Sequence, residues 1–310
     1  MEIKKHGLSP EVGTYNRLFF TCAKQLKIAQ AEEWFNMMLD EGLKPDAYSY
    51  NSLISIYGKA GQVESAESYF NQMRLSGVNP TAITYSAMMS AYAQAGDVEG
   101  AELCMDEMRE AKLELSVQIC GALLNACAKA CDGERAERWL HEMRRDGVRM
   151  NEKIFTSAMD AWANKGEIEG MERIFRLMQA SNVKPDAMTI CVLIKGCKRA
   201  RIDSKVDLVA HAEHYLCRII DRDVTPDVYV LNSMIDLCRL HRRHTVAFIW
   251  LRKMRKLGIR PNKFTVKIME GWREMSGERA AILKELRERG EVRAHDTRRR
   301  RVGGHGRSKR

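Results

Sequence analysis

Proline is scarce in this chain, with only six among 310 residues, and the six stand at regular intervals. They are Pro10, Pro45, Pro80, Pro185, Pro226 and Pro261. Their separations are 35 residues or three times 35, except for the step of 41 residues from Pro185 to Pro226. A fixed period of this length indicates an array of structural repeats, in which each unit packs only on its neighbours.

Cysteine pairs and long apolar runs are also missing. The nine cysteines form no CxxC pair, which argues against a disulfide framework and a zinc ribbon and favours a reducing compartment. The longest apolar candidate, residues 188–194, is far shorter than the roughly 18 residues that cross a bilayer. The opening MEIKKHGLSPE lacks the apolar centre of a signal peptide, so residues 1–11 are interpreted as the end of a truncated preceding repeat. We expect no membrane contact.

The motifs of catalysis are absent as well. The sequence has no nucleophile motif, phosphate-binding loop or acidic metal cluster, and it lacks the H-x-E and PCxxC signature of the zinc deaminases. His211, His214 and Cys217 recur at a spacing of three, but without a nearby carboxylate they indicate hairpin packing rather than a metal site. The sequence therefore predicts a protein that is not an enzyme and uses no cofactor, metal or small-molecule substrate.

Positive charge is in excess, and much of it is concentrated at the end of the chain. The net charge is +10, and residues 291–310 hold eight Lys or Arg against Glu291 and Asp296. Because this segment is rich in Gly and like charges and has almost no apolar residues, we predict a basic, disordered tail. Such a tail favours polyanions, and it serves either as a nonspecific RNA tether or as a localisation signal.

The repeat unit is defined by the segment Gly42-Leu-Lys-Pro45-Asp46 and its equivalents along the chain. When each unit begins after the residue that follows the proline, seven complete units result, and residues 263–290 form a partial repeat or capping helices. The units are residues 12–46, 47–81, 82–116, 117–151, 152–186, 187–227 and 228–262. We assign the six extra residues of 187–227 to a longer inter-helix turn near residues 198–205.

Each unit is predicted to be a helical hairpin. In residues 47–81, apolar residues recur at helical spacing in both halves, and Gly61 separates the halves. Gly77 suits the left-handed conformation that ends a helix, and Pro80 follows where a helix cannot continue. Positions 20 and 27 of the unit, usually Ala and Met, are interpreted as packing positions between helices. They are Ala31, Ala66, Ala101, Ala136, Met171, Ala212 and Ala247, and Met38, Met73, Met108, Met143, Met178, Ile219 and Met254.

Short motifs complete the pattern. The first helix opens with Thr14-Tyr15-Asn16, Ser49-Tyr50-Asn51 or Thr84-Tyr85-Ser86, the turn reads GKAG or QAG, and the unit ends in G-[LV]-[KN]-P-[DT]. This pattern resembles the pentatricopeptide repeat family over residues 1–290, and its terminal Pro-Asp and period of 35 separate it from tetratricopeptide repeats, with a period of about 34. The resemblance implies an all-α fold, a right-handed α-solenoid of stacked helical hairpins.

The same resemblance implies a function. The first helices would line a groove that binds single-stranded RNA, one base per repeat, as a non-catalytic adaptor. The family acts in organellar RNA metabolism, which implies a mitochondrion or plastid and RNA-processing proteins as further partners. The alternative is a helical-repeat scaffold that binds proteins without RNA specificity. A small or polar residue at position 5 beside Asp, Asn or Ser at position 35 favours RNA, because a peptide groove has no need of that pair.

The resemblance assigns base contacts to positions 2, 5 and 35 of each unit. Position 2 stacks on the base, which suits apolar and aromatic side chains. The stacking residues are Tyr48, Ile83, Met188, Tyr229 and Phe264. Other units carry Gly13, Gln118 and Lys153 there and are expected to hold a base less well. Position 13 is basic in four units, and its side chain either contacts phosphate or lies on a solvated face. These residues are Lys24, Lys59, Lys129 and Arg199.

Positions 5 and 35 are expected to recognise the Watson–Crick edge. An ionised Asp only accepts hydrogen bonds, so at position 35 it requires a ring N–H, as in uracil or guanine, whereas Asn, Ser and Thr donate to the bare ring nitrogen of adenine or cytosine. The family pairs Asn at position 5 with pyrimidines and Ser or Thr with purines. The pairs are Asn16/Asp46 for U, Asn51/Thr81 for C or U, Ser86/Ser116 for A, Thr156/Asp186 for G and Asn232/Asn262 for C, while Gly121/Asn151 and Cys191/Asp227 leave the base open. With the N-terminal repeat toward the 5′ end, the expected site is 5′-U-(C/U)-A-N-G-N-C-3′.

Overall fold

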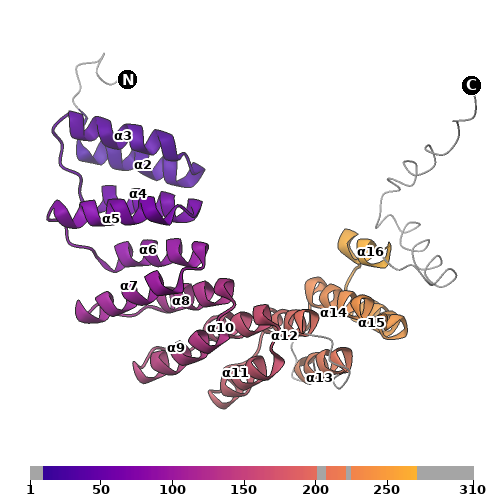
Figure 1. Ribbon diagram of the computed structural model, residues 1–310. Helices are drawn as coiled ribbons and strands as arrows, with labels where there is room; N and C mark the ends of the chain where they lie inside the picture. The colour runs from indigo at the N-terminus through magenta and orange to yellow at the C-terminus, as the bar shows by residue number, and fades with distance from the viewer. Residues whose placement is uncertain (1–9, 201–206, 221–224, 271–310) are drawn as a thin grey trace, which may run out of the picture. The chain divides into compact units, whose positions relative to one another are not determined.

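The chain folds into α-helices. The computed structural model describes residues 10–200, 207–220 and 225–270, and every regular element in these residues is helical, which confirms the all-α prediction (Figure 1). The helices are α2 (Val12–Gln25), α3 (Ile28–Asp40), α4 (Ala47–Ala60), α5 (Val63–Leu75), α6 (Ala82–Ala95), α7 (Val98–Glu110), α8 (Val117–Ala130), α9 (Gly133–Arg145), α10 (Glu152–Lys165), α11 (Ile168–Ala180), α12 (Ala187–Arg199), α13 (Leu208–Ile220), α14 (Val228–Leu240), α15 (His244–Lys256) and α16 (Lys263–Glu270). They form two compact units, one with α2 to α12 and one with α13 to α16. None of these described helices is long and apolar enough to span a membrane.

Within each compact unit, consecutive helices pair as hairpins with the period of the sequence, from α2 with α3 to α10 with α11 and again in α14 with α15. The first helix of each repeat starts at the first residue of a predicted unit, at Val12, Ala47, Ala82, Val117, Glu152, Ala187, Val228 and Lys263. Two or three residues separate the helices of a hairpin, except in the sixth repeat, where eight residues lie between Arg199 and Leu208. Most of the predicted insertion, the rest of the partial repeat and the basic tail lie outside the described residues.

Local backbone chemistry ends each hairpin. At the end of α3, the Gly42 N–H donates to Leu39 O at 2.9 Å and the Leu43 N–H donates to Met38 O at 3.1 Å. These bonds satisfy the last carbonyls of the helix and place Gly42 at φ 73°, a conformation that glycine adopts without strain. The chain then runs through the proline to the next first helix. Gly42 and Pro45 therefore fix where the first repeat stops, and Lys112 and Asn182 take the left-handed conformation at the ends of α7 and α11.

The core lies between the helices of successive hairpins. At positions 20 and 27, every side chain that the structure describes is fully buried, which confirms the packing role predicted for them. In the first cluster, Tyr15 of α2 packs with Phe35 of α3 and Tyr50 of α4, with ring centroids of Phe35 and Tyr50 5.6 Å apart. Because this cluster spans two repeats, the first and second hairpins stabilise one another.

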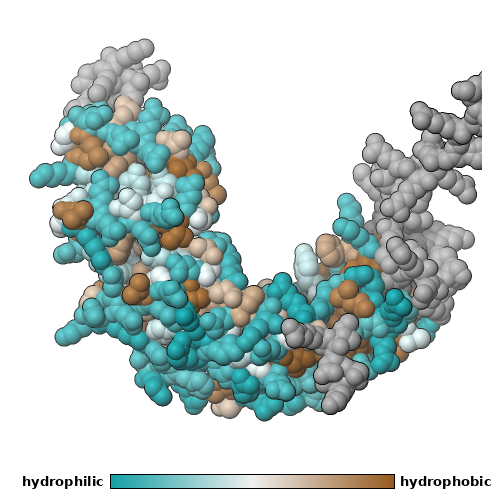
Figure 2. All heavy atoms as spheres, viewed as in Figure 1, coloured by the Kyte–Doolittle hydropathy of each residue, from teal (hydrophilic) through white to brown (hydrophobic). Residues whose placement is uncertain are grey.

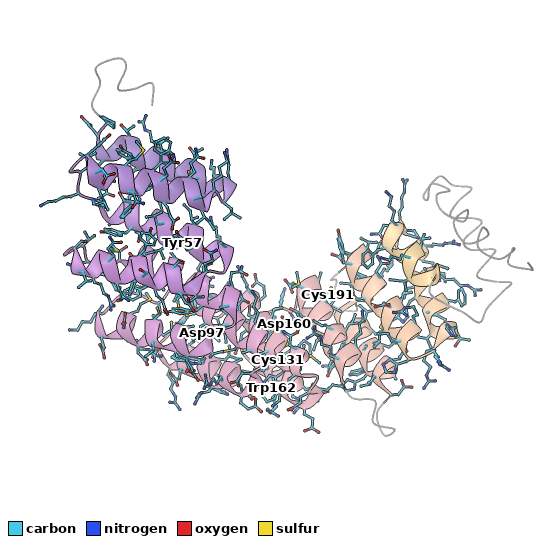
Figure 3. The ribbon with its side chains drawn as sticks, turned by 45° about the horizontal axis from the view of Figure 1, so that its top comes forward. Tyr57, Asp97, Cys131, Asp160, Trp162 and Cys191 are labelled. Carbon is cyan, nitrogen blue, oxygen red and sulfur yellow. The ribbon has the colours of Figure 1, made fainter. Side chains whose placement is uncertain are left out.

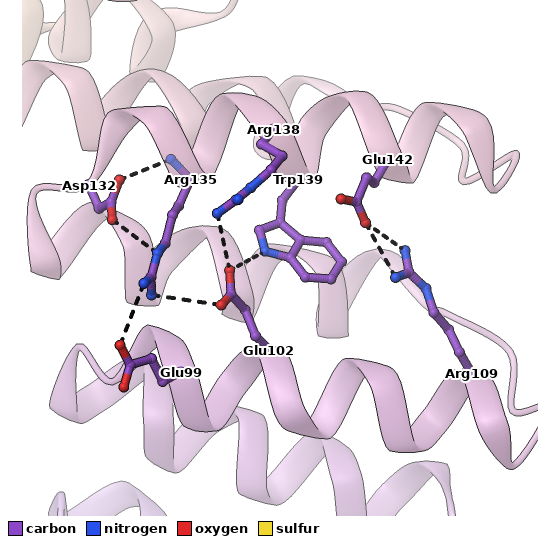
Figure 4. A network of polar contacts seen from close by, with 8 residues as sticks. All are labelled: Glu99, Glu102, Arg109, Asp132, Arg135, Arg138, Trp139 and Glu142. Carbon is purple, nitrogen blue, oxygen red and sulfur yellow. Dashed lines mark hydrogen bonds and ion pairs between the residues drawn. The ribbon is translucent and has the colours of Figure 1, made fainter.

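Carboxylates on the second helices also join neighbouring repeats. The Tyr92 hydroxyl donates to Glu67 Oε1 at 2.7 Å, and Trp139 Nε1 donates to Glu102 Oε1 at 2.7 Å, with Arg135 as an ion-pair partner of Glu102 (Figure 4). Burial and the bond to Glu67 raise the pKa of Tyr92. The carboxylates of these contacts stand at position 21, which is Glu in six units. These residues are Glu32, Glu67, Glu102, Glu137, Glu172 and Glu213. The periodicity of apolar residues does not reveal this regularity.

Candidate nucleic-acid interface

Position 2 presents its side chain to solvent at the start of each first helix. The five predicted stacking residues are large and apolar, yet Tyr48 is 47% exposed and Ile83 is 70% exposed. The other three, Met188, Tyr229 and Phe264, are exposed as well. Figure 2 shows scattered apolar patches on a largely hydrophilic surface. These side chains do not pack in the hydrophobic core, so their exposed faces can stack on a flat apolar ligand.

Position 35 is the N-cap of the next first helix. Asp46 Oδ1 accepts the Ser49 backbone N–H at 2.8 Å, and Asp186 Oδ1 accepts that of Thr189 at 2.7 Å. The other residues that cap in this way are Ser116, Asn151, Asp227 and Asn262. Thr81 forms a capping box with Thr84, in which the Thr81 backbone N–H donates to Thr84 Oγ1 at 3.0 Å and the two hydroxyls lie 3.3 Å apart. Capping alone accounts for Asp, Asn, Ser or Thr at this position, so the residue type does not by itself indicate base recognition.

The cap nevertheless decides which atom of position 35 is left for a ligand. Oδ1 of Asp186 and of Asp227 is taken by a backbone N–H, and no described residue donates to their Oδ2 atoms. An amide in the same place has to turn its oxygen toward the helix, so Asn151 and Asn262 are left with Nδ2. Asp thus offers an acceptor and Asn offers a donor, which is the chemistry that the expected bases require.

Position 5 reaches position 35 of its own repeat directly in the first and seventh repeats. Asn16 Nδ2 donates to Asp46 Oδ2 at 3.1 Å, and Asn232 Nδ2 donates to Asn262 Oδ1 at 3.1 Å. Both bonds join residues that are 30 apart in sequence. The structure therefore brings these two predicted pairs together, each at the junction between one hairpin and the next.

In the second, third and fifth repeats, no direct bond joins the described side chains at positions 5 and 35. Thr156 Oγ1 donates to Glu152 O at 2.6 Å and lies 3.2 Å from the hydroxyl of Thr189, the residue that caps onto Asp186. Among the described residues, no direct bond links Asn51 to Thr81 or Ser86 to Ser116. Gly121 has no side chain to offer, and Cys191 of α12 is partly exposed (Figure 3). Pairing at positions 5 and 35 is therefore uneven along the array.

Two surface pockets at repeat junctions are lined by residues at positions 2, 5 and 35. One, of about 610 Å³, is lined by Asn16, Arg17, Phe20, Thr21, Asp46 and Tyr48. The other, of about 510 Å³, is lined by Asn51, Ser55, Ala82, Ile83, Ser86, Ala87, Ser90, Glu114, Ser116, Gln118 and Ile119. Each combines positions 5 and 35 of one repeat with position 2 of the next, and each has a size typical of small-ligand sites. The sequence did not predict Phe20, an exposed aromatic ring at position 9 of its helix, as part of a site.

The basic residues at position 13 lie in the last turn of their helices, and three of them have neighbours within the protein. Lys24 Nζ lies 4.5 Å from the Phe20 ring centroid. Lys129 Nζ donates to Gln94 O and Oε1, each at 2.8 Å. Arg199 and Lys59 are also exposed, and Arg199 donates to Asn164 Oδ1 at 2.7 Å. Phosphate contact by these side chains stays a prediction.

His211, His214 and Cys217 of α13 are not part of a metal-binding cluster among the described residues. His211 Nε2 lies 3.0 Å from the Tyr215 hydroxyl. Across the described residues, no group of three or more His, Cys, Asp and Glu side chains is placed to hold a metal ion.

Comparison with known proteins identifies the repeat. The family described as the pentacotripeptide-repeat region of PRORP matches residues 3–167, a pentatricopeptide repeat-containing protein family matches residues 118–243, and the PPR repeat matches residues 229–259. No curated protein sequence matches the chain.

Solved structures share the fold at low sequence identity. The pentatricopeptide repeat protein PPR10 from maize is 19% identical with a TM-score of 0.51, over 93% of this chain and 48% of that chain. Its complex with an 18-nt psaJ RNA element aligns with a TM-score of 0.49 at 20% identity, over 94% of this chain and 52% of that chain. Nuclear proteinaceous RNase P 2 (PRORP2) from A. thaliana is 12% identical with a TM-score of 0.52, over 66% of this chain and 46% of that chain.

This chain thus spans about half the length of the maize protein. The first family match covers more than half of the present chain. Together with the helical hairpins that start every 35 residues, it shows that the chain belongs to the pentatricopeptide repeat family.

Proposed function

We propose that this chain is a sequence-specific adaptor for single-stranded RNA with no catalytic activity of its own. The observation that carries the proposal is the repeated junction between hairpins. There, an exposed apolar side chain at position 2 lies beside the residue at position 35 that caps the next helix. The side-chain atom of that residue that is not used in the cap is an acceptor in Asp and a donor in Asn. A stacking surface next to an oriented hydrogen-bonding group is what recognition of an unpaired base requires.

The proposed site is 5′-U-(C/U)-A-N-G-N-C-3′, read from the first repeat to the seventh. The acceptors at Asp46 and Asp186 suit the ring N–H groups of U and G, and the donor at Asn262 suits the bare ring nitrogen of C. The proposed role is the stabilisation, processing, splicing or translation of an organellar transcript, with RNA-processing proteins as partners. Family membership alone supports the address in a mitochondrion or plastid.

A selection on randomised RNA tests this register. We expect enrichment of the proposed site, with G at the fifth base as its most informative position, because the acceptor at Asp186 disfavours the bare ring nitrogens of A and C and Thr156 is expected to favour a purine over U. Enrichment without G at that position would show that the register is wrong. Binding to peptides in place of RNA would favour the protein-binding scaffold.

Deletion of residues 291–310 separates specificity from general attraction. The deletion removes eight positive charges and two negative charges. We expect overall RNA affinity to fall and the slope of log affinity against log salt to become shallower, because fewer counterions are released on binding. The base preferences should persist, since they belong to the repeats. A selection and a salt titration of both chains measure the two effects, and loss of base preference would contradict the assignment of specificity to the repeats.

A further inference from the structure

In the part of the chain that the structure describes, buried Ser, Thr and Asn side chains occur at only two positions of the repeat. Across the described residues they are Ser49, Thr84, Thr156, Thr189, Asn232 and Thr265. Thr156 and Asn232 stand at position 5, and the other four stand at position 3 of the following repeat. Burial of a polar group is costly unless it is hydrogen-bonded. The arrangement of these groups therefore indicates a specific task at the junction, which apolar side chains of the same size would not perform.

In the first junction, the hydroxyl at position 3 holds the amide at position 5. Ser49 Oγ donates to Asn16 Oδ1 at 2.7 Å. Asn16 Nδ2 in turn donates to Asp46, and the Asp46 backbone N–H points to the same Ser49 hydroxyl at 3.4 Å. Asn16 of α2, the N-cap residue Asp46 and Ser49 of α4 thus form a closed circuit of hydrogen bonds.

The seventh junction repeats this circuit with other residue types. Thr265 Oγ1 donates to Asn232 Oδ1 at 2.6 Å, Asn232 Nδ2 donates to Asn262 Oδ1 at 3.1 Å, and the Asn262 backbone N–H donates to Thr265 Oγ1 at 3.1 Å. The two junctions lie more than 200 residues apart in sequence, so the circuit does not depend on one local environment.

The circuit fixes which way the amide of position 5 faces. An Asn side chain that is free to turn by half a rotation offers either its oxygen or its nitrogen to a base. With its oxygen on the hydroxyl and one N–H on position 35, Asn232 keeps one N–H in a defined direction. The hydroxyl at position 3 therefore sets the donor pattern that the pair at positions 5 and 35 presents.

Other junctions lack one part of this arrangement. Position 3 is apolar in the junctions of Ser86, Gly121 and Cys191, where it is Ile119, Ile154 or Val230. In the second junction, the Thr84 hydroxyl instead lies 3.0 Å from the Thr81 backbone nitrogen and 3.3 Å from the Thr81 hydroxyl. There, Asn51 Oδ1 is buried and accepts no hydrogen bond from the described residues.

We propose that the hydroxyl at position 3 of the following repeat is a positioning residue that sets how strictly the preceding repeat selects its base. This inference rests on the proposed RNA-binding function and deepens it. It predicts strict selection of a pyrimidine by the first and seventh repeats, where the hydroxyl holds Asn16 and Asn232. It predicts looser selection by the second repeat, where Asn51 is not held.

Two substitutions at Thr265 test the proposal in the full chain. Thr265→Val removes only the hydroxyl, and valine already stands at this position as Val230. Thr265→Ser keeps the hydroxyl, and serine already stands there as Ser49. We measure the affinity of each variant for RNAs that carry the proposed site and differ only at the seventh base, together with a set that differs only at the fifth base.

We expect Thr265→Val to lower the preference for C at the seventh base by about fivefold, the order of one neutral hydrogen bond, and Thr265→Ser to retain it. Preference for G at the fifth base should be unchanged in both variants. The inference is overturned if Thr265→Val keeps its preference for C, or if it weakens binding to all RNAs equally together with a lower melting temperature. Absence of any base preference in the unaltered chain would overturn the proposed function itself.

Discussion

The variant Asp186→Asn is expected to change the fifth base from G to A. In the unaltered chain, Asp186 Oδ1 is held by the Thr189 backbone N–H and hydroxyl, each at 2.7 Å, so Oδ2 is the atom left to accept the ring N–H of guanine. An Asn in this place must keep its oxygen on the helix and present Nδ2, which donates to the bare ring nitrogen of adenine. Thr156, which is expected to direct the repeat to purines, is unaltered. The preference should move by about 1–3 kcal/mol, or roughly 5- to 150-fold.

Competition between two RNAs that differ only at the fifth base measures this change. Asn and Asp are about equal as N-caps, so the melting temperature should not move, and an effect on binding cannot be assigned to a damaged helix. Asp186→Ala is the matched control, because it removes the cap, costs about 1 kcal/mol of stability and offers neither a donor nor an acceptor to the base. The reverse exchange, Asn262→Asp, should move the seventh base from C to U. If Asp186→Asn still prefers G, position 35 of this repeat is a cap and nothing more.

The sequence predicts the hairpins and their starting residues because the responsible chemistry is local. The left-handed Gly42, the proline after it and the capping residue Asp46 act within a few residues of one another. The six buried methionines described at position 27 of the repeat follow from helical periodicity in the same way. For these features, no knowledge of the neighbouring hairpin is needed.

The site is only partly predictable because its decisive contacts cross the junction between repeats. The residue types at positions 5 and 35 are visible in the sequence, but the cap that selects Oδ2 of Asp186 or Nδ2 of Asn262 is a matter of geometry. Ser49 and Asn16 are 33 residues apart, and nothing in their local sequence shows that their side chains form a hydrogen bond. Phe20 likewise becomes part of a pocket only through the position of the next hairpin.

The variant Gly170→Ala is expected to destabilise the stack, although alanine is the better helix former. Trp162 of α10 is buried between α9 and α11 (Figure 3). A Cβ at Gly170 would lie 2.3 Å from Trp162 Cδ2, and one at Gly133 would lie 2.2 Å from the same atom. Lys165 and Arg173 also lie near the ring, each 5.2 Å from its centroid, so the indole cannot move aside freely. Overpacking of this kind costs about 1–3 kcal/mol.

Denaturant unfolding of matched variants distinguishes this clash from the general effect of glycine in a helix. Gly121→Ala in α8 is the control, because a Cβ there meets nothing within 4 Å, and it should stabilise the chain by about 0.5–1 kcal/mol. The substitution Trp162→Phe makes room for the new methyl group and removes the indole Nε1, which is buried without a hydrogen bond among the described residues. Gly170→Ala should therefore cost less in the Trp162→Phe background than in the unaltered chain. Equal costs in both backgrounds, or a gain in stability like that of Gly121→Ala, would show that Trp162 does not require a glycine on the facing helix.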